Sequence, residues 1–315
     1  MKKISVLIPT YNEQENVKPL CLEIVKIFAE KLQNYDYEIL FIDNYSQDKT
    51  REIIEQLCAD NKKIKAVFNA KNFGAIRSSF YGMLQTTGDC TIGMCADFQD
   101  PPEMITEFVK AWEGGHKIVT GKKHKSHENP AVYFLRGLYY RFLKKIAETK
   151  QLEQFTGFGL YDRSFIDVLR TLEDPMPYMR GMVAELGFAH AEIEYVQPKR
   201  RAGKTSNNWY SLYDMAMLGI TSYTKIVMRF ATISGFLISG ISFLVAMYYL
   251  IMKLIFWNKF PLGTAPIIIS IFFLGSIQLF FIGFLGEYIL NINTRVMKRP
   301  LVIEEKRINM TRERI

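Results

Sequence analysis

Two aspartates stand directly after short apolar runs in the N-terminal part of the chain. Asp43 follows the run Tyr37–Ile42, and Asp97 follows the run Cys90–Ala96. Both runs predict buried strands, and in open α/β sheets ligands bind beyond the carboxyl ends of the strands. Carboxylates at such an edge can accept hydrogen bonds from a ligand or bind a hard cation such as Mg²⁺. The pattern therefore predicts a ligand site that uses both residues.

The elements that position these aspartates alternate between strand and helix, which predicts an α/β fold with a mostly parallel sheet between helices. The first helix follows a loop containing Tyr11, and the last is opened by Pro101-Pro102-Glu103, where proline is well placed. The predicted strands are Ile4–Ile8, Tyr37–Ile42, Ile64–Phe68 and Cys90–Ala96, and the predicted helices are Asn16–Leu32, Arg51–Asp60, Gly74–Gln85 and the segment after Pro101.

Two apolar segments near the C-terminus predict a membrane anchor. Phe230–Met252 and Phe260–Gly286 contain no Asp, Glu, Lys or Arg, and each exceeds the roughly 20 helical residues that cross a hydrocarbon core. The short joint Lys253–Lys259 indicates a two-helix transmembrane hairpin. We therefore expect a catalytic domain at residues 1–225, two transmembrane helices at 226–290 and a basic tail at 291–315.

The net charge of +8 is concentrated beside the predicted hairpin. Basic clusters flanking a membrane segment favour the cytoplasmic side, where they meet anionic lipid. We therefore expect an integral protein of the cytoplasmic membrane, with its catalytic domain and both termini cytoplasmic, and no nucleic-acid partner. The N-terminus shows no signal peptide, and reduced cysteines are expected. The basic residues are Lys199, Arg200, Arg201 and Lys204 before the hairpin, and Arg295, Lys298, Arg299, Lys306, Arg307, Arg312 and Arg314 after it.

Two further stretches have amphipathic or apolar-rich character. Ala131–Glu148 and Tyr210–Lys225 each predict a helix that either lies in the membrane interface or packs on the core. Both interpretations stay open at this point.

Four segments occur in an order that resembles the inverting family 2 glycosyltransferases. Within that family, the pattern is similar to the polyprenyl-phosphate branch, which contains dolichol-phosphate mannose synthase and the bactoprenol glucosyltransferases. The resemblance covers the N-terminal domain and extends to the two apolar spans, and it implies a nucleotide-binding α/β domain of the GT-A type. The segments are IPTYNE (Ile8–Glu13), IDNYSQDKT (Ile42–Thr50), NAKNFGAIRS (Asn69–Ser78) and ADFQDPPE (Ala96–Glu103).

The resemblance assigns expected roles to individual residues. Asp97 and Gln99 match the motif that holds Mg²⁺ or Mn²⁺ and acts in catalysis; the competing interpretation of Asp97 is a helix N-cap before Pro101. The residues implied for nucleotide binding are Pro9, Tyr11, Glu13, Asp43 and Arg77. The cations expected at the acceptor phosphate are Lys122, Lys123, Arg200, Arg201 and Lys204.

Three positions depart from the family pattern: Cys95 replaces the first acid of the metal motif, Asn44 replaces one of two paired acids, and Gly157 stands where an acid is proposed as the base. Hard Mg²⁺ does not favour a thiol, so Cys95 is not expected to be a ligand. An acceptor phosphate is already anionic, because its second pKa is about 6, and it needs no protein base. The loss at Gly157 therefore favours a phosphate acceptor, with Asp162 expected to be structural.

The expected activity is metal-dependent, inverting transfer of a hexose from a nucleotide sugar, UDP-linked, to polyprenyl phosphate at the cytoplasmic face. Two alternatives stay open: a different lipid or glycan acceptor, and a non-catalytic membrane scaffold with a degenerate site. The resemblance also implies a homo-oligomer, a tetramer. No motif encodes the identity of the sugar.

Overall fold

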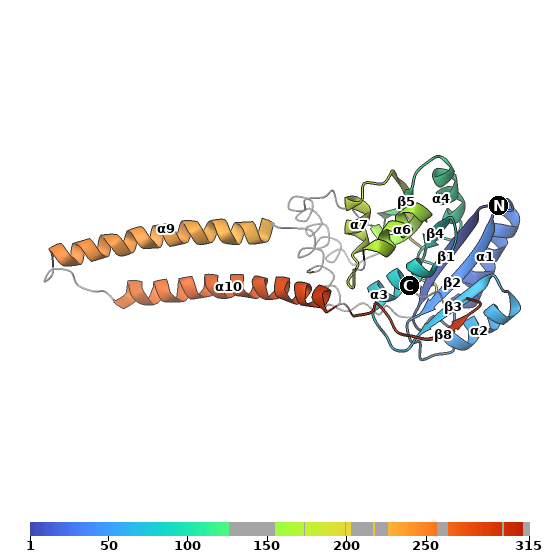
Figure 1. Cartoon of the computed structure of the whole chain (residues 1–315), viewed down its shortest axis with the longest axis horizontal. Helices are drawn as coiled ribbons and strands as arrows, with labels where there is room; N and C mark the ends of the chain where they lie inside the picture. Colours follow the sequence, from blue (N-terminus) through green and yellow to red (C-terminus); the bar gives the residue numbers. More distant parts are fainter. Residues whose placement is uncertain are drawn as a thin grey trace.

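The chain forms an α/β domain from which two long helices project side by side (Figure 1). A computed structural model describes residues 1–125, 155–172, 174–198, 200–202, 217, 226–256, 264–297 and 299–310. The predicted amphipathic helix Ala131–Glu148 lies outside these residues, and so does Tyr210–Lys225 apart from Met217.

One eight-stranded sheet forms the centre of the domain, in the order β7-β5-β6-β4-β1-β2-β3-β8. The strands β3, β2, β1 and β4 pair in parallel, as the alternating pattern predicts. The pairings of β6 with β4 and β5, and of β8 with β3, are antiparallel, so the sheet is mixed. The strands are β1 (Lys3–Thr10), β2 (Asp36–Asp43), β3 (Ile64–Asn69), β4 (Cys90–Gly93), β5 (Ile118–Lys125), β6 (Phe155–Asp162), β7 (His190–Val196) and β8 (Glu304–Ile308).

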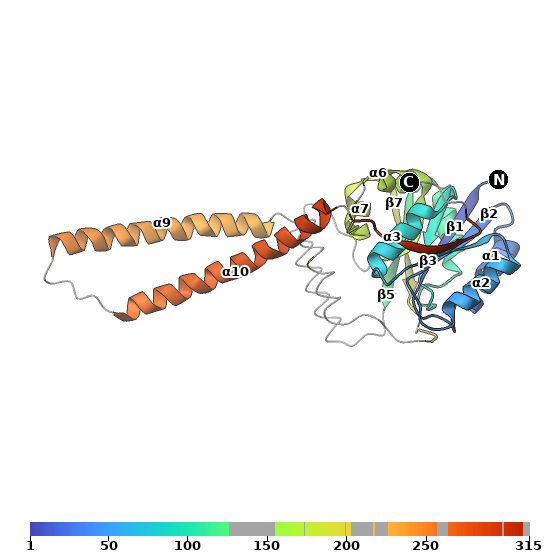
Figure 2. The ribbon, with the colours of Figure 1, turned by 60° about the horizontal axis from the view of Figure 1, so that its bottom comes forward.

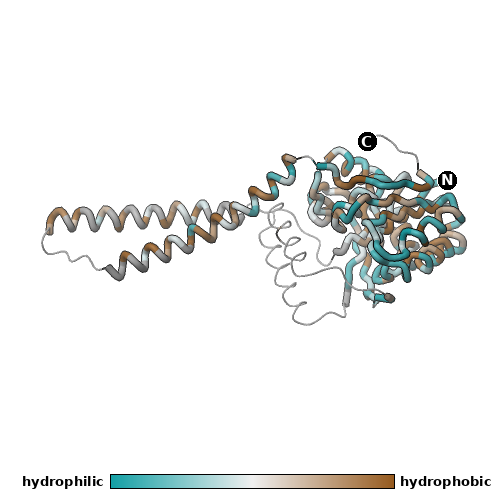
Figure 3. The backbone as a smooth tube through the Cα atoms, turned by 90° about the horizontal axis from the view of Figure 1, so that it is seen from below, coloured by the Kyte–Doolittle hydropathy of each residue, from teal (hydrophilic) through white to brown (hydrophobic). Residues whose placement is uncertain are grey.

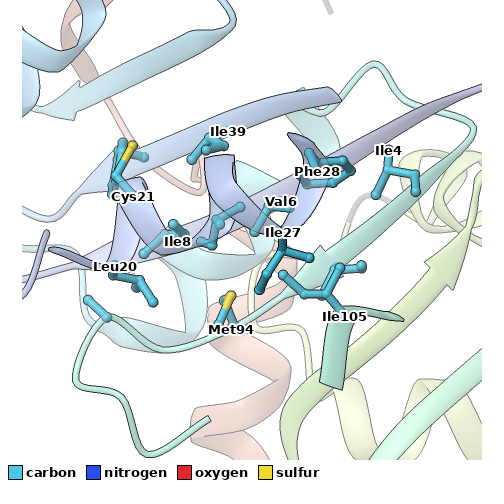
Figure 4. Packing of buried hydrophobic residues seen from close by; sticks show 14 of the residues in the cluster. Ile4, Val6, Ile8, Leu20, Cys21, Ile27, Phe28, Ile39, Met94 and Ile105 are labelled. Carbon is cyan, nitrogen blue, oxygen red and sulfur yellow. The ribbon is translucent and has the colours of Figure 1, made fainter. Parts of the chain in front are cut away.

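Helices cover both faces of the sheet because alternate strand residues point to opposite faces. On one face, Val6 packs in a buried cluster with Leu20 and Ile105, to which α1, α2 and α4 contribute (Figure 4). On the other face, Leu7 packs with Phe80 and with residues of α6 and α7. The helices of the domain are α1 (Val17–Lys31), α2 (Thr50–Asp60), α3 (Ala75–Gln85), α4 (Met104–Glu113), α6 (Arg163–Thr171) and α7 (Met179–Glu185).

The two projecting helices, α9 (Ile226–Ile255) and α10 (Thr264–Val296), coincide with the predicted apolar spans (Figure 2). Hydrophobic positions recur along both (Figure 3), and α10 runs ten residues beyond the predicted end at Gly286. Within the described residues, one stretch, Phe273–Val296, is long and apolar enough to cross a membrane. The α/β domain is thus confirmed, and the two-span hairpin stays a prediction.

The segment after α10 returns to the α/β domain. Residues Glu304–Ile308 form β8 and pair antiparallel with β3, with Lys306 opposite Phe68. Side chains hold the strand as well: Arg307 donates to the Gln85 amide oxygen at 2.7 Å, and Lys306 pairs with Glu55 at 2.8 Å. The region expected as a basic tail therefore contributes an edge strand to the sheet.

Candidate functional site

The loops after β1 and β2 interlock at the carboxyl edge of the sheet. The amide of Asn12 donates to Ser46 Oγ at 2.8 Å, and the amide of Glu13 donates to Thr50 Oγ1 at 2.8 Å. In return, the amide of Gln47 donates to Asn12 Oδ1 at 2.8 Å. These contacts join the first two predicted motifs into one rigid rim.

Backbone geometry also marks this edge. Asn12, Tyr45 and Phe98 have positive φ angles of 56°, 70° and 62°, and they lie in the loops after β1, β2 and β4. Left-handed backbone costs energy for residues other than glycine and clusters at functional sites. Tyr11 and Tyr45 are also exposed large side chains. Tyr45 was not among the residues selected from the sequence, although it lies within the predicted segment Ile42–Thr50.

Asp43 ends β2 and is fully buried. Its carboxylate accepts hydrogen bonds from the amide of Ser46 at 3.0 Å and from Thr10 Oγ1 at 3.3 Å, and it pairs with Arg51, with 3.3 Å from Nε to Oδ2. Burial raises the pKa of Asp43, whereas the Ser46 hydrogen bonds and the Arg51 charge oppose the rise. Both carboxylate oxygens thus accept hydrogen bonds within the protein, and the role of Asp43 in nucleotide binding stays a prediction.

Asn44 has a structural task that the sequence did not reveal. Its Oδ1 accepts from the amide of Phe73 at 2.9 Å and from Asn69 Nδ2 at 3.2 Å, while its Nδ2 donates to Asn72 Oδ1 at 2.8 Å. An amide can donate and accept at once, whereas an ionised carboxylate only accepts. Asn44 thus ties the third motif loop to the end of β2.

Asp97 lies in the loop between β4 and α4 and is buried. Its Oδ1 accepts from the amide of Gln99 at 3.1 Å. Helix α4 begins at Met104 with Glu103 as its N-cap, so Asp97 does not cap that helix. This finding rules out the interpretation of Asp97 as the N-cap of α4, and its role as a ligand-binding residue stays a prediction.

Cys95 lies beside a second buried acid in the same loop. Its amide donates to Asp100 Oδ2 at 2.8 Å, and Tyr195 donates its hydroxyl to Asp100 Oδ1 at 3.2 Å. Cys95 is exposed at the surface, and the Asp100 charge beside it raises the pKa of its thiol. The expectation that Cys95 does not bind the metal stays a prediction.

Arg200 bridges the first and fourth motif loops. Its guanidinium lies 2.9 Å from Glu13 (Nη2 to Oε1) and 3.1 Å from Asp97 (Nε to Oδ2). The amide of Arg201 donates to the Asp97 carbonyl at 3.3 Å, and its guanidinium lies 5.0 Å from the centre of the Phe98 ring. Arg200, which is expected at the acceptor phosphate, therefore pairs with acids of two motif loops, and Arg201 contacts one of those loops.

Lys122 and Lys123 are consecutive on β5, so they point to opposite faces of the sheet. Lys122 pairs with Glu192 of β7 at 3.1 Å. Lys123 is opposite Tyr195 of β7 in register. Burial raises the pKa of Asp100, and the charge of Lys123 partly opposes that rise. The structure thus brings Lys123, and not Lys122, towards the Asp97 loop. Lys204 lies outside the described residues.

Arg77 lies in the first turn of α3, and its Nε contacts Met176 Sδ at 3.2 Å. Pro9 lies in β1 opposite Ile42 of β2. The pairing of β1 with β4 ends two residues earlier, at Leu7. The missing amide proton of Pro9 therefore leaves that pairing intact. Pro9 stands one residue before the end of β1, and its ring restricts the backbone that leads into the first loop.

Asp162 and Gly157 occupy opposite ends of β6. Asp162 is opposite Cys90, at the far end of β4 from the site, and it caps α6 and accepts from Trp112 Nε1 at 2.7 Å. Gly157 lies beyond the Gly93–Gly159 pair, near the Asp97 loop, with a φ of +97° that disfavours other residues. The structural position expected for Asp162 is confirmed.

Hard-cation chemistry fits these residues in a limited way. Asp97 Oδ2 already forms an ion pair with the guanidinium of Arg200, which also pairs with Glu13. Among the described residues, no group of three or more His, Cys, Asp or Glu side chains can hold a metal alone. Asp97 and Gln99 stay the predicted ligands of Mg²⁺ or Mn²⁺, and two protein ligands would leave the other positions of such a cation to further oxygens.

Comparisons with known proteins show the family of this chain. The family model described as glycosyl transferase family 2 matches residues 5–169. A bactoprenol glucosyl transferase of Shigella phage SfX is 32% identical over 306 residues, covering 97% of this chain and 99% of that protein. A prophage bactoprenol glucosyl transferase homolog of Escherichia coli K12 is 31% identical over 302 residues, covering 96% of this chain and 98% of that protein. The crystal structure of S. aureus TarS 1-349 with UDP-GlcNAc has 16% identity and a TM-score of 0.44, covering 70% of this chain and 67% of that chain.

Proposed function

The chain belongs to glycosyl transferase family 2, and from its site we propose that it transfers a hexose from a UDP-sugar to polyprenyl phosphate at the cytoplasmic face of the membrane. The observation that carries this proposal is that Asp43 and Asp97 lie at or just after the ends of the parallel strands on either side of β1, at the same edge of the sheet, and that Arg200 pairs with Asp97. The names of the bactoprenol relatives support a polyprenyl-phosphate acceptor.

The donor half of the site is built by the first two loops and the Asp97 loop. Asp43 accepts a hydrogen bond from the nucleoside, and Tyr11 supplies an exposed aromatic face beside it. Pro9 shapes the loop that carries Tyr11 and Glu13, and Arg77 at the start of α3 contributes positive charge on the donor side. Asp97 and Gln99 would hold Mg²⁺ or Mn²⁺, and the ion would supply charge neutralisation for the leaving nucleotide.

The transfer itself needs no base from the protein. A phosphate oxygen of the acceptor attacks the anomeric carbon in line with the departing group. The new carbon–oxygen bond forms as the bond to the UDP oxygen breaks, and the electron pair leaves with UDP, so the configuration inverts. Since the attacking oxygen carries no proton when the phosphate is fully ionised, Gly157 is compatible with this step.

The acceptor half requires cations beside the reacting carbon. Lys123, Arg200 and Arg201 approach the Asp97 loop and can hold the acceptor phosphate through charge-assisted hydrogen bonds. Arg200 exchanges its acidic partners for substrate phosphate when the site fills. Lys122 faces the other side of β5 and is a weaker candidate. Lys204 stays a prediction from the sequence.

The membrane part of the proposal rests on α9 and α10. Large apolar side chains along both helices are exposed, including Phe236 at 76% and Leu279 at 72%. An exposed apolar surface of this extent marks a membrane or partner interface. We propose that both helices span the cytoplasmic membrane, with residues 1–225 and 291–315 on the cytoplasmic side, and that the protein assembles as a homotetramer.

The direct test is a product assay. Membranes containing the full chain are incubated with polyprenyl phosphate and, separately, a panel of UDP- and GDP-sugars, and the lipid product is identified by mass. The expected product is a hexosyl phosphopolyprenol formed from one UDP-sugar, absent with the Asp97→Ala variant. Transfer to diacylglycerol or to a glycan instead would refute the acceptor assignment.

A further inference from the structure

The carboxylate of Asp43 has one cationic partner, and that partner comes from α2. Among the described residues, Arg51 is the only cation that forms an ion pair with Asp43, at 3.3 Å from Nε to Oδ2. The other groups facing the carboxylate are the hydroxyl of Thr10 from β1 and the backbone and hydroxyl of Ser46. Arg51 therefore carries the charge compensation of a fully buried acid.

Arg51 is itself fixed from three directions. Its Nη2 lies 2.8 Å from Glu305 Oε2 in β8 and 3.4 Å from the Asn69 carbonyl in β3. Its guanidinium lies 5.0 Å from the centre of the Phe68 ring and 5.8 Å from that of Tyr45. Different nitrogens of one planar group thus reach Asp43 and Glu305, a geometry that a lysine ammonium cannot reproduce.

Glu305 comes from the strand that follows the long helix α10. Its neighbour Glu304 is opposite Asn69, and Lys306 is opposite Phe68, which is in turn opposite Asp43 in β2. A row of paired residues therefore runs from β2 through β3 to β8. The side chain of Arg51 makes a second connection between β2 and β8, because it pairs with Asp43 and with Glu305.

We propose that Arg51, oriented by Glu305 from β8, is a positioning residue that keeps Asp43 ionised and aimed at the nucleoside of the donor. The inference rests on the proposed function, because it takes Asp43 as the nucleoside acceptor. It adds that the segment after the membrane helices is part of the donor site. The chain's C-terminal strand thus contributes to donor affinity and not only to the fold.

The test measures UDP binding to the detergent-solubilised full chain by calorimetry, with donor KM and kcat measured in parallel. Glu305 is about half exposed, with 51% of its side chain accessible, so Glu305→Gln should weaken UDP binding only about two- to fivefold. Arg51→Gln should weaken it at least about tenfold, because it leaves a buried acid unpaired. In both variants the donor KM should rise, while kcat stays near that of the wild type.

Two further variants separate positioning from general stability. Lys306→Gln removes a neighbouring ion pair of the same strand, with Glu55, and should leave UDP binding unchanged. Arg51→Lys keeps the positive charge and loses the bridge, so adding Glu305→Gln to it should have no further effect. The acid limb of UDP binding should move to higher pH in Arg51→Gln and stay in place in Arg51→Lys.

The outcomes distinguish this inference from the function beneath it. If the wild type binds UDP and Asp43→Asn does not, but Glu305→Gln binds as tightly as the wild type, the relay through β8 is refuted and the donor site stands. If Lys306→Gln weakens binding as much as Glu305→Gln does, β8 acts through stability alone and the inference is refuted. If the wild type binds no UDP, the donor assignment itself is refuted.

Discussion

Arg200 and Asp97 form an ion pair at the carboxyl edge of the sheet, with 3.1 Å between Nε and Oδ2. The two residues come from segments far apart in the sequence, after β7 and after β4. The pair places a protein cation on the carboxylate that we assign to the metal. The Arg200 side chain and a divalent ion must therefore compete for Asp97 when no donor is bound.

This competition predicts the metal affinity of an Arg200→Ala variant. The Arg200 side chain is 25% exposed, and an ion pair of this kind is worth about 1 kcal/mol. Without the donor, the variant should therefore bind Mn²⁺ about fivefold more tightly, as measured by the loss of the free-ion signal in electron paramagnetic resonance. Its KM for the lipid phosphate should rise, because one cation of the acceptor half is lost. Unchanged Mn²⁺ affinity would place the metal away from Asp97.

Replacing Asp97 itself should abolish transfer without unfolding the domain. Asp97→Ala removes the carboxylate at the junction of metal and diphosphate, where charge develops on the leaving nucleotide. The matched change Cys95→Ala, in the same loop, should cost much less, because Mg²⁺ and Mn²⁺ do not favour a thiol ligand. Initial rates at saturating Mn²⁺ compare the two. Equal losses would show that the thiol also serves the metal.

Local patterns predicted the strands β1, β2 and β4 that lead into this site, although β4 ends at Gly93 and not at the predicted Ala96. Asp43 and Asp97 end apolar runs, and the structure places both at the carboxyl edge of the parallel strands. The adjacency of Lys122 and Lys123 in the sequence also predicts that only one of them faces the site, because adjacent residues of a strand point to opposite sides of the sheet. Their grouping as one phosphate cluster ignored that alternation.

Contacts between distant segments could not be predicted. The residues Glu304–Ile308 are mostly charged and resemble a solvated tail, and their pairing with β3 is visible only in three dimensions. Arg51 looks like an ordinary helix residue until Asp43 and Glu305 are placed on either side of it. Asn44 looked like the loss of an acid, whereas its amide organises the loop at Asn72.

The opposite end of the sheet should control acid stability. Glu38 is buried and accepts hydrogen bonds from Lys3, Lys65, Ser5 and Thr87, which outweigh the effect of burial and lower its pKa to about 2. Because the pKa of Glu38 is lower in the folded state, its ionised form stabilises the fold at pH values above the unfolded pKa, here 4.5. This stabilisation is lost as the pH falls towards the folded pKa. The shift corresponds to about 3 kcal/mol.

Glu38→Gln should therefore lower the melting temperature of the full chain by about 6–12 °C at pH 7, followed with a dye that reacts with cysteines exposed on unfolding. The difference from wild type should narrow as pH falls from 4.5 towards 2. Asp36→Asn, on the same strand, removes only an exposed pair with Lys63 and should change little. A pH-independent difference would assign the effect of Glu38→Gln to packing.

The position of β8 predicts how the chain responds to truncation. A form that ends near residue 225 loses both long helices and an edge strand, and it should lose UDP affinity and melt earlier than the full chain. A second form, with residues 299–310 rejoined through a flexible linker, restores the strand and should recover UDP binding. That form should use short-chain prenyl phosphate better, relative to the long-chain lipid, than the full chain does. Equal UDP binding by the two forms would contradict a role for β8.

Ionisation of the acceptor should dominate the acid limb of the pH profile. Because Gly157 leaves no acid at the position of the family's base, and the phosphate needs none, activity should fall as pH drops through about 6, the second pKa of a phosphate monoester. Initial rates from pH 5 to 8, with UDP-sugar saturating, would locate this limb.

The control for this profile is Asp162→Asn. Asp162 caps α6 and pairs with Lys117 at 3.1 Å, far from the Asp97 loop. Its replacement should lower stability by about 1 kcal/mol through the lost cap, and it should leave the acid limb in place. Polyprenol offered instead of its phosphate should give no product, because a neutral hydroxyl has no base to remove its proton. Equal transfer to polyprenol would refute both the base-free mechanism and the assignment of the lipid substrate.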